Sequence, residues 1–145
     1  MYDVNKNNEE LQNYKGGGYF GQWNTDKIIE SYFPNRTNGF CIEVGAADGI
    51  RGSNTKYFEN LGWNTLCIEP NIKYKESLER NRELIRYYAC GSDNKDDIEL
   101  TIFDVGDNNI MSSLTSLVPD KRLVRDHGHL INDKYTVDVN VRTLS

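Results

Sequence analysis

Short apolar runs separate longer amphipathic stretches along the first two-thirds of the chain. Residues 40–44, 64–69 and 84–90 are such runs; each begins after a turn, and a glycine follows the first and the third. Apolar runs of this length, bounded by turn residues, predict buried β-strands. The pattern therefore predicts three strands in this part of the chain.

The stretches around these strands have helical spacing. Residues 26–33, 53–61 and 74–83 are predicted helices, and Thr25 stands where an N-cap of the first helix is expected. The predicted apolar face of that first helix consists of Ile28, Ile29, Tyr32 and Phe33. Because strands and helices then follow one another in two βαβ units, the pattern predicts a parallel sheet with right-handed crossovers.

The last third of the chain has a different pattern. Residues 98–105 and 135–144 alternate apolar and polar positions, as half-buried antiparallel strands do. Val137, Val139 and Val141 are expected on one face, and the residues between the two strands are expected to form a polar loop region. The predicted fold class is α/β: a Rossmann-like parallel sheet with added antiparallel strands in the C-terminal third.

Length and charge narrow the possibilities. The chain has 145 residues; residues 1–18 are polar and end in three glycines, which predicts a flexible tail, and residues 19–145 are expected to form a single domain. With 22 acidic and 17 basic side chains, the net charge is -5. This balance argues against nucleic acid and anionic membranes as partners.

The compartment is expected to be the cytoplasm, with no membrane association. No segment has the apolar core of a secretory signal or the length of a membrane helix. Cys41, Cys67 and Cys90 lack the spacing of a metal site, so reduced, buried structural thiols are expected.

Candidate chemistry follows the first two predicted strands. The first strand runs into EVGAADG, residues 43–49, whose glycines permit a tight turn and the close approach of a ligand. Glu69 stands at the carboxyl end of the second strand, where an acid accepts hydrogen bonds from ribose hydroxyls. Ligands of open α/β sheets bind outside the carboxyl ends of the strands, so a nucleoside-cofactor site is predicted. A glycine turn in a purely structural βαβ unit is the alternative.

Spacing and charge in this loop favour one cofactor class. The glycines are spaced GxxxG, whereas a dinucleotide loop has GxGxxG. Glu43 and Asp48 place negative charge where a pyrophosphate would bind, whereas a sulfonium amino acid carries positive charge and no phosphate. The loop therefore favours S-adenosylmethionine over NAD, with a nicotinamide-dependent oxidoreductase as a further alternative.

Several segments of the chain resemble the FkbM-type methyltransferases. These segments are FGQWNTDK, FCIEVGAADGIRGSNTKYFENLGW, LCIEPN, ACGS and SSL, and the resemblance spans residues 20–144. It implies a class I methyltransferase fold, S-adenosylmethionine as cofactor, and transfer of a methyl group to a hydroxyl on a sugar or small natural product.

The resemblance also implies where the cofactor would lie. Glu69 would hold the ribose hydroxyls, Cys90 would lie near the adenine, and Gln22 would belong to a segment that closes over the cofactor. Ser53 matches an SNT motif, with a plain helix cap as the alternative. The predicted cofactor-binding residues are Gln22, Glu43, Gly45, Ala46, Asp48, Gly49, Asn54, Glu69, Pro70, Asn71 and Cys90.

Members of this family continue past the TL motif into a further core strand beside the first one. Because this chain ends at Ser145, we expect either a fragment or a naturally short relative. The strand at 40–44 is expected to be apolar on both faces, and its edge would then be open. A homodimer through that edge, or an N-terminal segment that covers it, is predicted.

The alternative function is a truncated, non-catalytic cofactor-binding or assembly module of the same fold. No catalytic residue is assigned. His127 and His129 are candidates for a general base, and residues of a surface loop otherwise.

Overall fold

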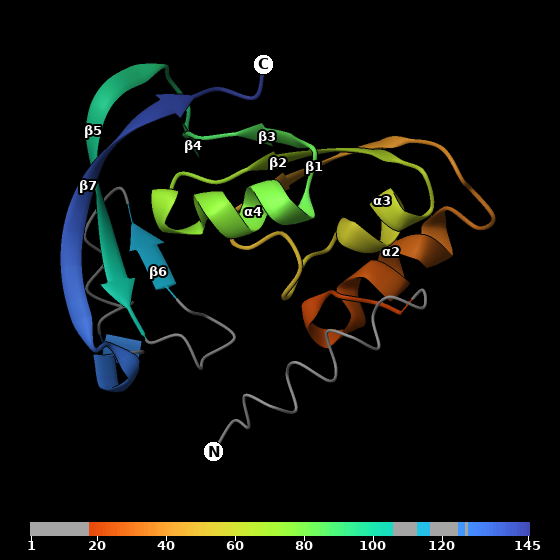
Figure 1. Cartoon of the computed structure of the whole chain (residues 1–145), viewed down its shortest axis with the longest axis horizontal. Helices are drawn as coiled ribbons and strands as arrows, with labels where there is room; N and C mark the ends of the chain where they lie inside the picture. The colour runs from red at the N-terminus through yellow and green to blue at the C-terminus, as the bar shows by residue number, and fades with distance from the viewer. Residues whose placement is uncertain (1–17, 106–112, 117–124, 127) are drawn as a thin grey trace. The chain divides into compact units, whose positions relative to one another are not determined.

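The structure is a computed structural model that describes residues 18–105, 113–116, 125–126 and 128–145. The chain divides into two compact units; one ends at Tyr88 and the other begins at Ala89. Figure 1 shows the elements of both units. Of the predicted tail, residues 1–17 lie outside the described part of the chain.

The first unit is built on a three-stranded parallel sheet. Strands β1 (Phe40–Val44), β2 (Asn64–Ile68) and β3 (Leu84–Arg86) are hydrogen-bonded in the order β1-β2-β3. Ile42 pairs with Leu66, and Leu66 pairs with Leu84. The predicted parallel sheet is confirmed, and the first strand has the predicted bounds.

Helices connect these strands as predicted, although they are shorter. They are α2 (Thr25–Tyr32), α3 (Lys56–Asn60) and α4 (Lys75–Asn81), with the 3-10 turns η2 (Gln22–Asn24) and η3 (Ile72–Tyr74) before α2 and α4. Thr25 is the first residue of α2 and not its N-cap, because Asn24 occupies the N-cap position. The Thr25 hydroxyl donates to the Gln22 carbonyl oxygen at 2.6 Å. Gly62 ends the α3 segment with a φ of 100°, which a residue with a side chain adopts only under strain.

The prediction that α2 buries an apolar face is wrong. Ile28, Tyr32 and Phe33 are 57%, 76% and 40% exposed, whereas Asp26 is fully buried. The carboxylate of Asp26 accepts the backbone N–H of Phe20 at 2.5 Å and that of Gly21 at 3.0 Å. Backbone hydrogen bonds to a buried carboxylate therefore orient α2, where apolar packing was expected.

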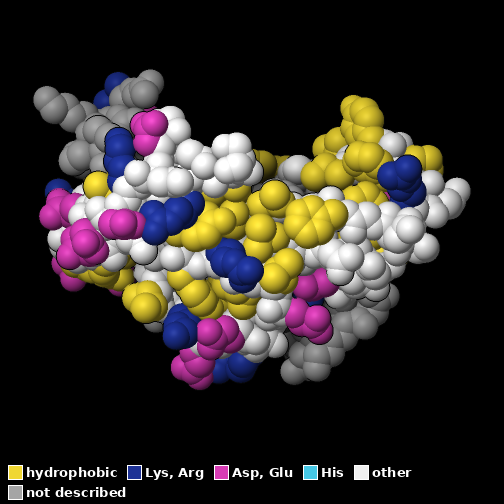
Figure 2. All heavy atoms as spheres, turned by 90° about the horizontal axis from the view of Figure 1, so that it is seen from above, with side chains coloured by type: hydrophobic (Ala, Val, Ile, Leu, Met, Phe, Trp, Pro, Cys, Tyr) yellow, Lys and Arg dark blue, Asp and Glu magenta, His cyan; other side chains and the backbone are white. Residues whose placement is uncertain are grey.

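One face of this sheet packs against helices, whereas side chains of β1 on the other face are exposed. On the side of α3 and α4, Cys67 packs with Leu78 of α4 and with Ala46, and Ile85 lies against this cluster. On the other side, Phe40, Ile42 and Val44 of β1 are 56%, 42% and 54% exposed. Figure 2 is seen from above Figure 1 and shows hydrophobic side chains at the surface.

The expectation that β1 has two apolar faces is therefore wrong for the described residues, whereas an open edge is what the sequence predicts and what the order of the described strands shows. β1 lies at the edge of its sheet, and its face toward the helices carries Cys41 and the carboxylate of Glu43. The alternation of exposed and covered positions has the period of two that a strand imposes.

The second unit contains a mixed four-stranded sheet. Its strands are β4 (Ala89–Cys90), β5 (Lys95–Asp104), β6 (Ser113–Ser116) and β7 (Asp133–Arg142), in the order β4-β7-β5-β6. β5 pairs antiparallel with β7 and with β6, while β4 pairs parallel with β7. The two predicted antiparallel strands are confirmed, and Val141 is buried on the face that Val137 and Val139 share.

Two predictions for this region are corrected. The run at 84–90 is not one strand, because it divides into β3 and β4, which belong to different sheets. The predicted polar loop region contains strand β6 and the 3-10 turn η4 (Gly128–Leu130). None of the described helices is long and apolar enough to cross a membrane.

Candidate functional site

The loop after β1 turns sharply at the carboxyl edge of the parallel sheet. Gly45 and Ala46 both donate their backbone N–H to the Ile68 carbonyl oxygen, at 2.8 and 3.2 Å. Gly45 has a φ of 79°, and a Cβ built on it would meet no atom within 4 Å. The glycine therefore serves the turn, and it leaves open space in front of the loop.

Glu69 lies at the end of β2 and is joined to this loop. Its Oε2 accepts the Ala47 N–H at 2.8 Å, and its Oε1 accepts the Asn71 N–H at 2.8 Å. The side chain is 5% exposed. Burial raises the pKa of the Glu69 carboxyl, and the two backbone N–H groups partly oppose that rise. The structure thus brings the predicted loop and the predicted acid into direct contact.

Glu43 points away from the open space of the loop, toward the helices. Its Oε2 accepts the hydroxyls of Ser53 and Thr55, each at 2.7 Å, and its Oε1 accepts the Asn54 N–H at 2.7 Å. Ser53 in turn accepts the Lys56 N–H at 2.9 Å, which caps the first turn of α3. Glu43 therefore fixes the path from β1 into α3, and Ser53 has the capping role named as its alternative.

Arg82 is a buried neighbour of the loop that the sequence did not indicate. Its side chain is fully buried, and Nη1 lies 3.2 Å from Glu43 Oε2 and 2.9 Å from the Gly49 carbonyl oxygen. Nη2 donates to the hydroxyls of Thr55 and Thr65, at 2.6 and 3.0 Å. An arginine after an amphipathic helix usually belongs to a solvated face, so no local signal marks it as buried.

Gly49 contacts the protein and not the open side of the loop. A Cβ on Gly49 would meet the Arg82 side chain at 2.6 Å and Leu78 at 2.8 Å, and its φ is 81°. The second glycine of the GxxxG pattern is therefore required by the packing of the loop on α4.

Asp48 is also paired within the protein. Its Oδ2 lies 2.6 Å from Arg51 Nε, and its Oδ1 accepts the N–H groups of Ile50 and Arg51, both at 2.9 Å. Both loop acids thus have a cationic partner, because Glu43 is paired with Arg82. Because both acids are paired, they would repel a pyrophosphate much less than the sequence alone suggests.

Four other predicted site residues lie near the loop or beside Glu69. A β-bridge joins Gly21 to Gly52, so the half-buried Gln22 lies next to the loop segment that precedes Asn54. Asn54 itself is exposed. Pro70 is partly buried, and Asn71 is buried with its Oδ1 accepting the Lys73 N–H at 3.0 Å.

Three further candidate residues are not placed at this loop. Cys90 lies in β4, in the second unit, so the structure does not place it at the loop. His127 lies outside the described residues, and His129 is exposed in η4. Among the residues that the structure describes, no group of three His, Cys, Asp or Glu side chains has the arrangement of a metal site.

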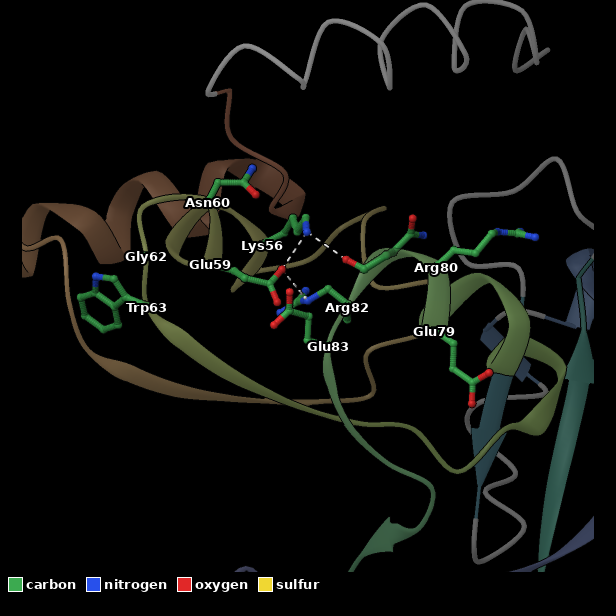
Figure 3. A pocket seen from close by; sticks show the side chains of 10 residues that line it. Lys56, Glu59, Asn60, Gly62, Trp63, Glu79, Arg80, Arg82 and Glu83 are labelled. Atoms are coloured by element: carbon green, nitrogen blue, oxygen red, sulfur yellow. Dashed lines mark hydrogen bonds and ion pairs between the residues drawn. The ribbon is translucent and has the colours of Figure 1, made fainter.

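A hollow of about 440 Å³ lies between α3 and α4, lined by residues that include Lys56, Glu59, Trp63 and Glu83 (Figure 3). Lys56 Nζ is 2.7 Å from Glu59 Oε2, and that oxygen is 3.1 Å from Arg82 Nε. Trp63 directly precedes β2 and Glu83 precedes β3, so the hollow lies at the amino ends of the strands. It is distinct from the predicted site, which lies at their carboxyl ends.

No known family model, curated protein or solved structure matches this chain.

Proposed function

We propose that the chain binds S-adenosylmethionine at the carboxyl edge of the β1-β2-β3 sheet, in a Rossmann-like fold of the class I methyltransferase type. The observation that carries the proposal is the hydrogen bond from Ala47 N–H to Glu69 Oε2 at 2.8 Å. It joins the glycine turn after β1 to the acid after β2, the two elements that hold a nucleoside cofactor in folds of this kind.

The environment of Glu69 favours a ligand that donates hydrogen bonds. Each carboxylate oxygen accepts one backbone N–H and keeps a further lone pair. Burial leaves the charge of this carboxylate poorly solvated, which raises its pKa, and two ribose hydroxyls would supply further donors. The open space at Gly45 gives the rest of such a ligand room beside the backbone.

The proposed reaction is transfer of a methyl group to a hydroxyl oxygen of a sugar or small natural product. The cofactor, when bound, supplies a methyl group on a positively charged sulfur. The contribution of the chain is alignment, with Glu69 and the loop backbone holding the ribose side while the acceptor approaches. A module that binds the cofactor without catalysis would use the same residues.

A dinucleotide is a second candidate for the same site, and the ion pairs of the loop favour it. With Asp48 bound to Arg51 and Glu43 bound to Arg82, the loop presents less negative charge than its sequence suggests. The GxxxG spacing still distinguishes this loop from the usual dinucleotide pattern.

Calorimetric titration with S-adenosylmethionine, S-adenosylhomocysteine and NADH tests the proposal. We expect saturable binding of the first two, weakened about tenfold or more in Glu69→Gln, because hydrogen bonds to a charged group are lost. Glu76→Gln, at an exposed acid of α4, is the matched control and should bind as the parent does. Binding of NADH alone would favour the second candidate, and binding of none of the three would refute both.

Two glycine variants sharpen this test. Gly45→Ala and Gly52→Ala both place a side chain at positive φ with no atom nearby, so each should cost about 1 kcal/mol of stability. Only Gly45 is proposed to face the ligand, so only Gly45→Ala should lower affinity for the cofactor.

A further inference from the structure

The backbone of β1 has one unpaired side in the described part of the chain. Asn64 N–H donates to the Gly39 carbonyl oxygen, and Gly45 N–H donates to the Ile68 carbonyl oxygen, at 2.9 and 2.8 Å. Backbone groups alternate in direction along a strand, so the N–H and C=O groups of Phe40, Ile42 and Val44 point away from β2. No described strand pairs with that side.

This edge lacks the features by which proteins usually protect exposed strands. The strand FCIEV contains no lysine and no proline, and its pairing with β2 runs through all five residues without a bulge. Its single charge, on Glu43, is directed toward α3 and is paired with Arg82. Within the described part of the chain, the open edge is therefore apolar, free of bulges and not covered by another strand.

We propose that a second copy of this chain pairs with β1, antiparallel and across a two-fold axis at Ile42. In this register Ile42 lies opposite its own counterpart, and Phe40 lies opposite Val44 of the other copy. The three residues with free backbone groups then meet the same three residues, which gives about six backbone hydrogen bonds. Pairs of an aromatic and a β-branched residue are favourable across strands.

The arrangement also keeps the charged residues of the two β3 strands far apart. The two copies would form one six-stranded sheet in the order β3-β2-β1-β1-β2-β3. Arg86, the charged residue of β3, would then lie on the outermost strand at each end, so like charges stay far apart. Six exposed apolar side chains would join into one surface at the centre, since each copy supplies Phe40, Ile42 and Val44.

The contact is small compared with a permanent dimer. Five residues of each copy meet along one strand, which falls on the low side of the ~1,200 Å² that stable interfaces bury. We therefore expect a reversible dimer with a dissociation constant on the order of micromolar or weaker.

Opposite charges introduced at position 42 test whether the partner is a second copy of this chain and whether Ile42 lies at the two-fold axis. The measurement is sedimentation equilibrium. Ile42→Lys and Ile42→Glu should each be monomeric, because like charges would face one another at the axis. An equal mixture of the two variants should dimerise, because Lys then faces Glu. Ile28→Lys, at an exposed isoleucine of α2, is the matched control and should dimerise as the parent does.

The recovery in the mixture shows that both variants are folded, so loss of the dimer is not confused with unfolding. A parent chain that stays monomeric at all accessible concentrations overturns the proposal. So does a parent dimer that Ile42→Lys leaves intact, or a mixture that does not recover. Cofactor binding is not part of these outcomes, so the proposed function stands or falls separately.

Discussion

Three buried carboxylates of the first unit differ in the groups that compensate their burial. Asp26 accepts three backbone N–H groups, those of Phe20, Gly21 and Lys27. Glu43 accepts hydroxyls and lies beside Arg82. Glu69 is paired with two backbone N–H groups, and burial raises its pKa. Glu69 has the fewest donors of the three, so it gains most from a further donor, which is why the proposed ligand is placed there.

The raised pKa of Glu69 predicts a pH-dependent cost in stability. When the folded pKa exceeds the unfolded pKa, the folded state binds more protons between the two values, so the stabilising contribution of the group is lost as pH rises. Urea unfolding from about pH 4 to about pH 8 measures this. The free energy of unfolding of the parent minus that of Glu69→Gln should fall as pH rises through this range and then level off. A pH-independent difference would contradict the assignment.

At the scale of elements, Arg82 contacts β1 with the loop that follows it, α3 and β2. It contacts Glu43 of β1, the carbonyl of Gly49 in the loop, and Thr65 of β2. Its Nε lies 3.1 Å from Glu59 Oε2 in α3, close enough for an ion pair although without hydrogen-bond geometry. The loop conformation therefore depends on a residue that need not touch any ligand.

Replacing Arg82 should be costly. Arg82→Met would leave Glu43 and Glu59 without their buried cation, and we expect a loss of about 3–5 kcal/mol in urea unfolding. Arg80→Met is the control, because Arg80 pairs with Glu76 at the surface and its loss should change stability by less than about 0.5 kcal/mol. Equal effects of the two variants would show that the buried network contributes nothing beyond an exposed pair.

Local periodicity explains which elements could be predicted from sequence. The strand at 40–44 is confirmed with its bounds because an apolar run between turns needs no distant partner to define it. The helices α3 and α4 lie within their predicted ranges for the same reason. The division of 84–90 into β3 and β4 depends on which strand each half pairs with, and this is a non-local property.

The candidate site shows the same division. The motif pattern predicts the loop and Glu69, and the structure brings them into contact. The pairing of Glu43 with Arg82 spans 39 residues, and no spacing rule connects positions that far apart. The prediction of an apolar face on α2 is wrong because the buried carboxylate of Asp26 orients that helix. Hydrophobic periodicity takes no account of such a group.

At the scale of the whole molecule, the two units differ in how their sheets are joined. The parallel sheet of the first unit needs helical crossovers between its strands, whereas β5 and β7 of the second form a long antiparallel pair. The proposed pairing of β1 with a second copy would extend the first sheet alone. An association of this kind would stabilise the first unit by an amount that grows with the logarithm of protein concentration once that concentration exceeds the dissociation constant.

Because the three cysteines are divided between the two units, their alkylation rates can report the local unfolding of each unit separately. Burial raises the pKa of Cys41 to about 11 and that of Cys67 to about 12, and both lie in the first unit, whereas Cys90 lies in the second. Alkylation needs the thiolate, so labelling of the first two at neutral pH should wait for the sheet to open. Followed by mass spectrometry, Arg82→Met should speed labelling of Cys41 and Cys67 and leave Cys90 unchanged. A common rate at all three thiols would instead mean that the two halves of the chain open as one cooperative body.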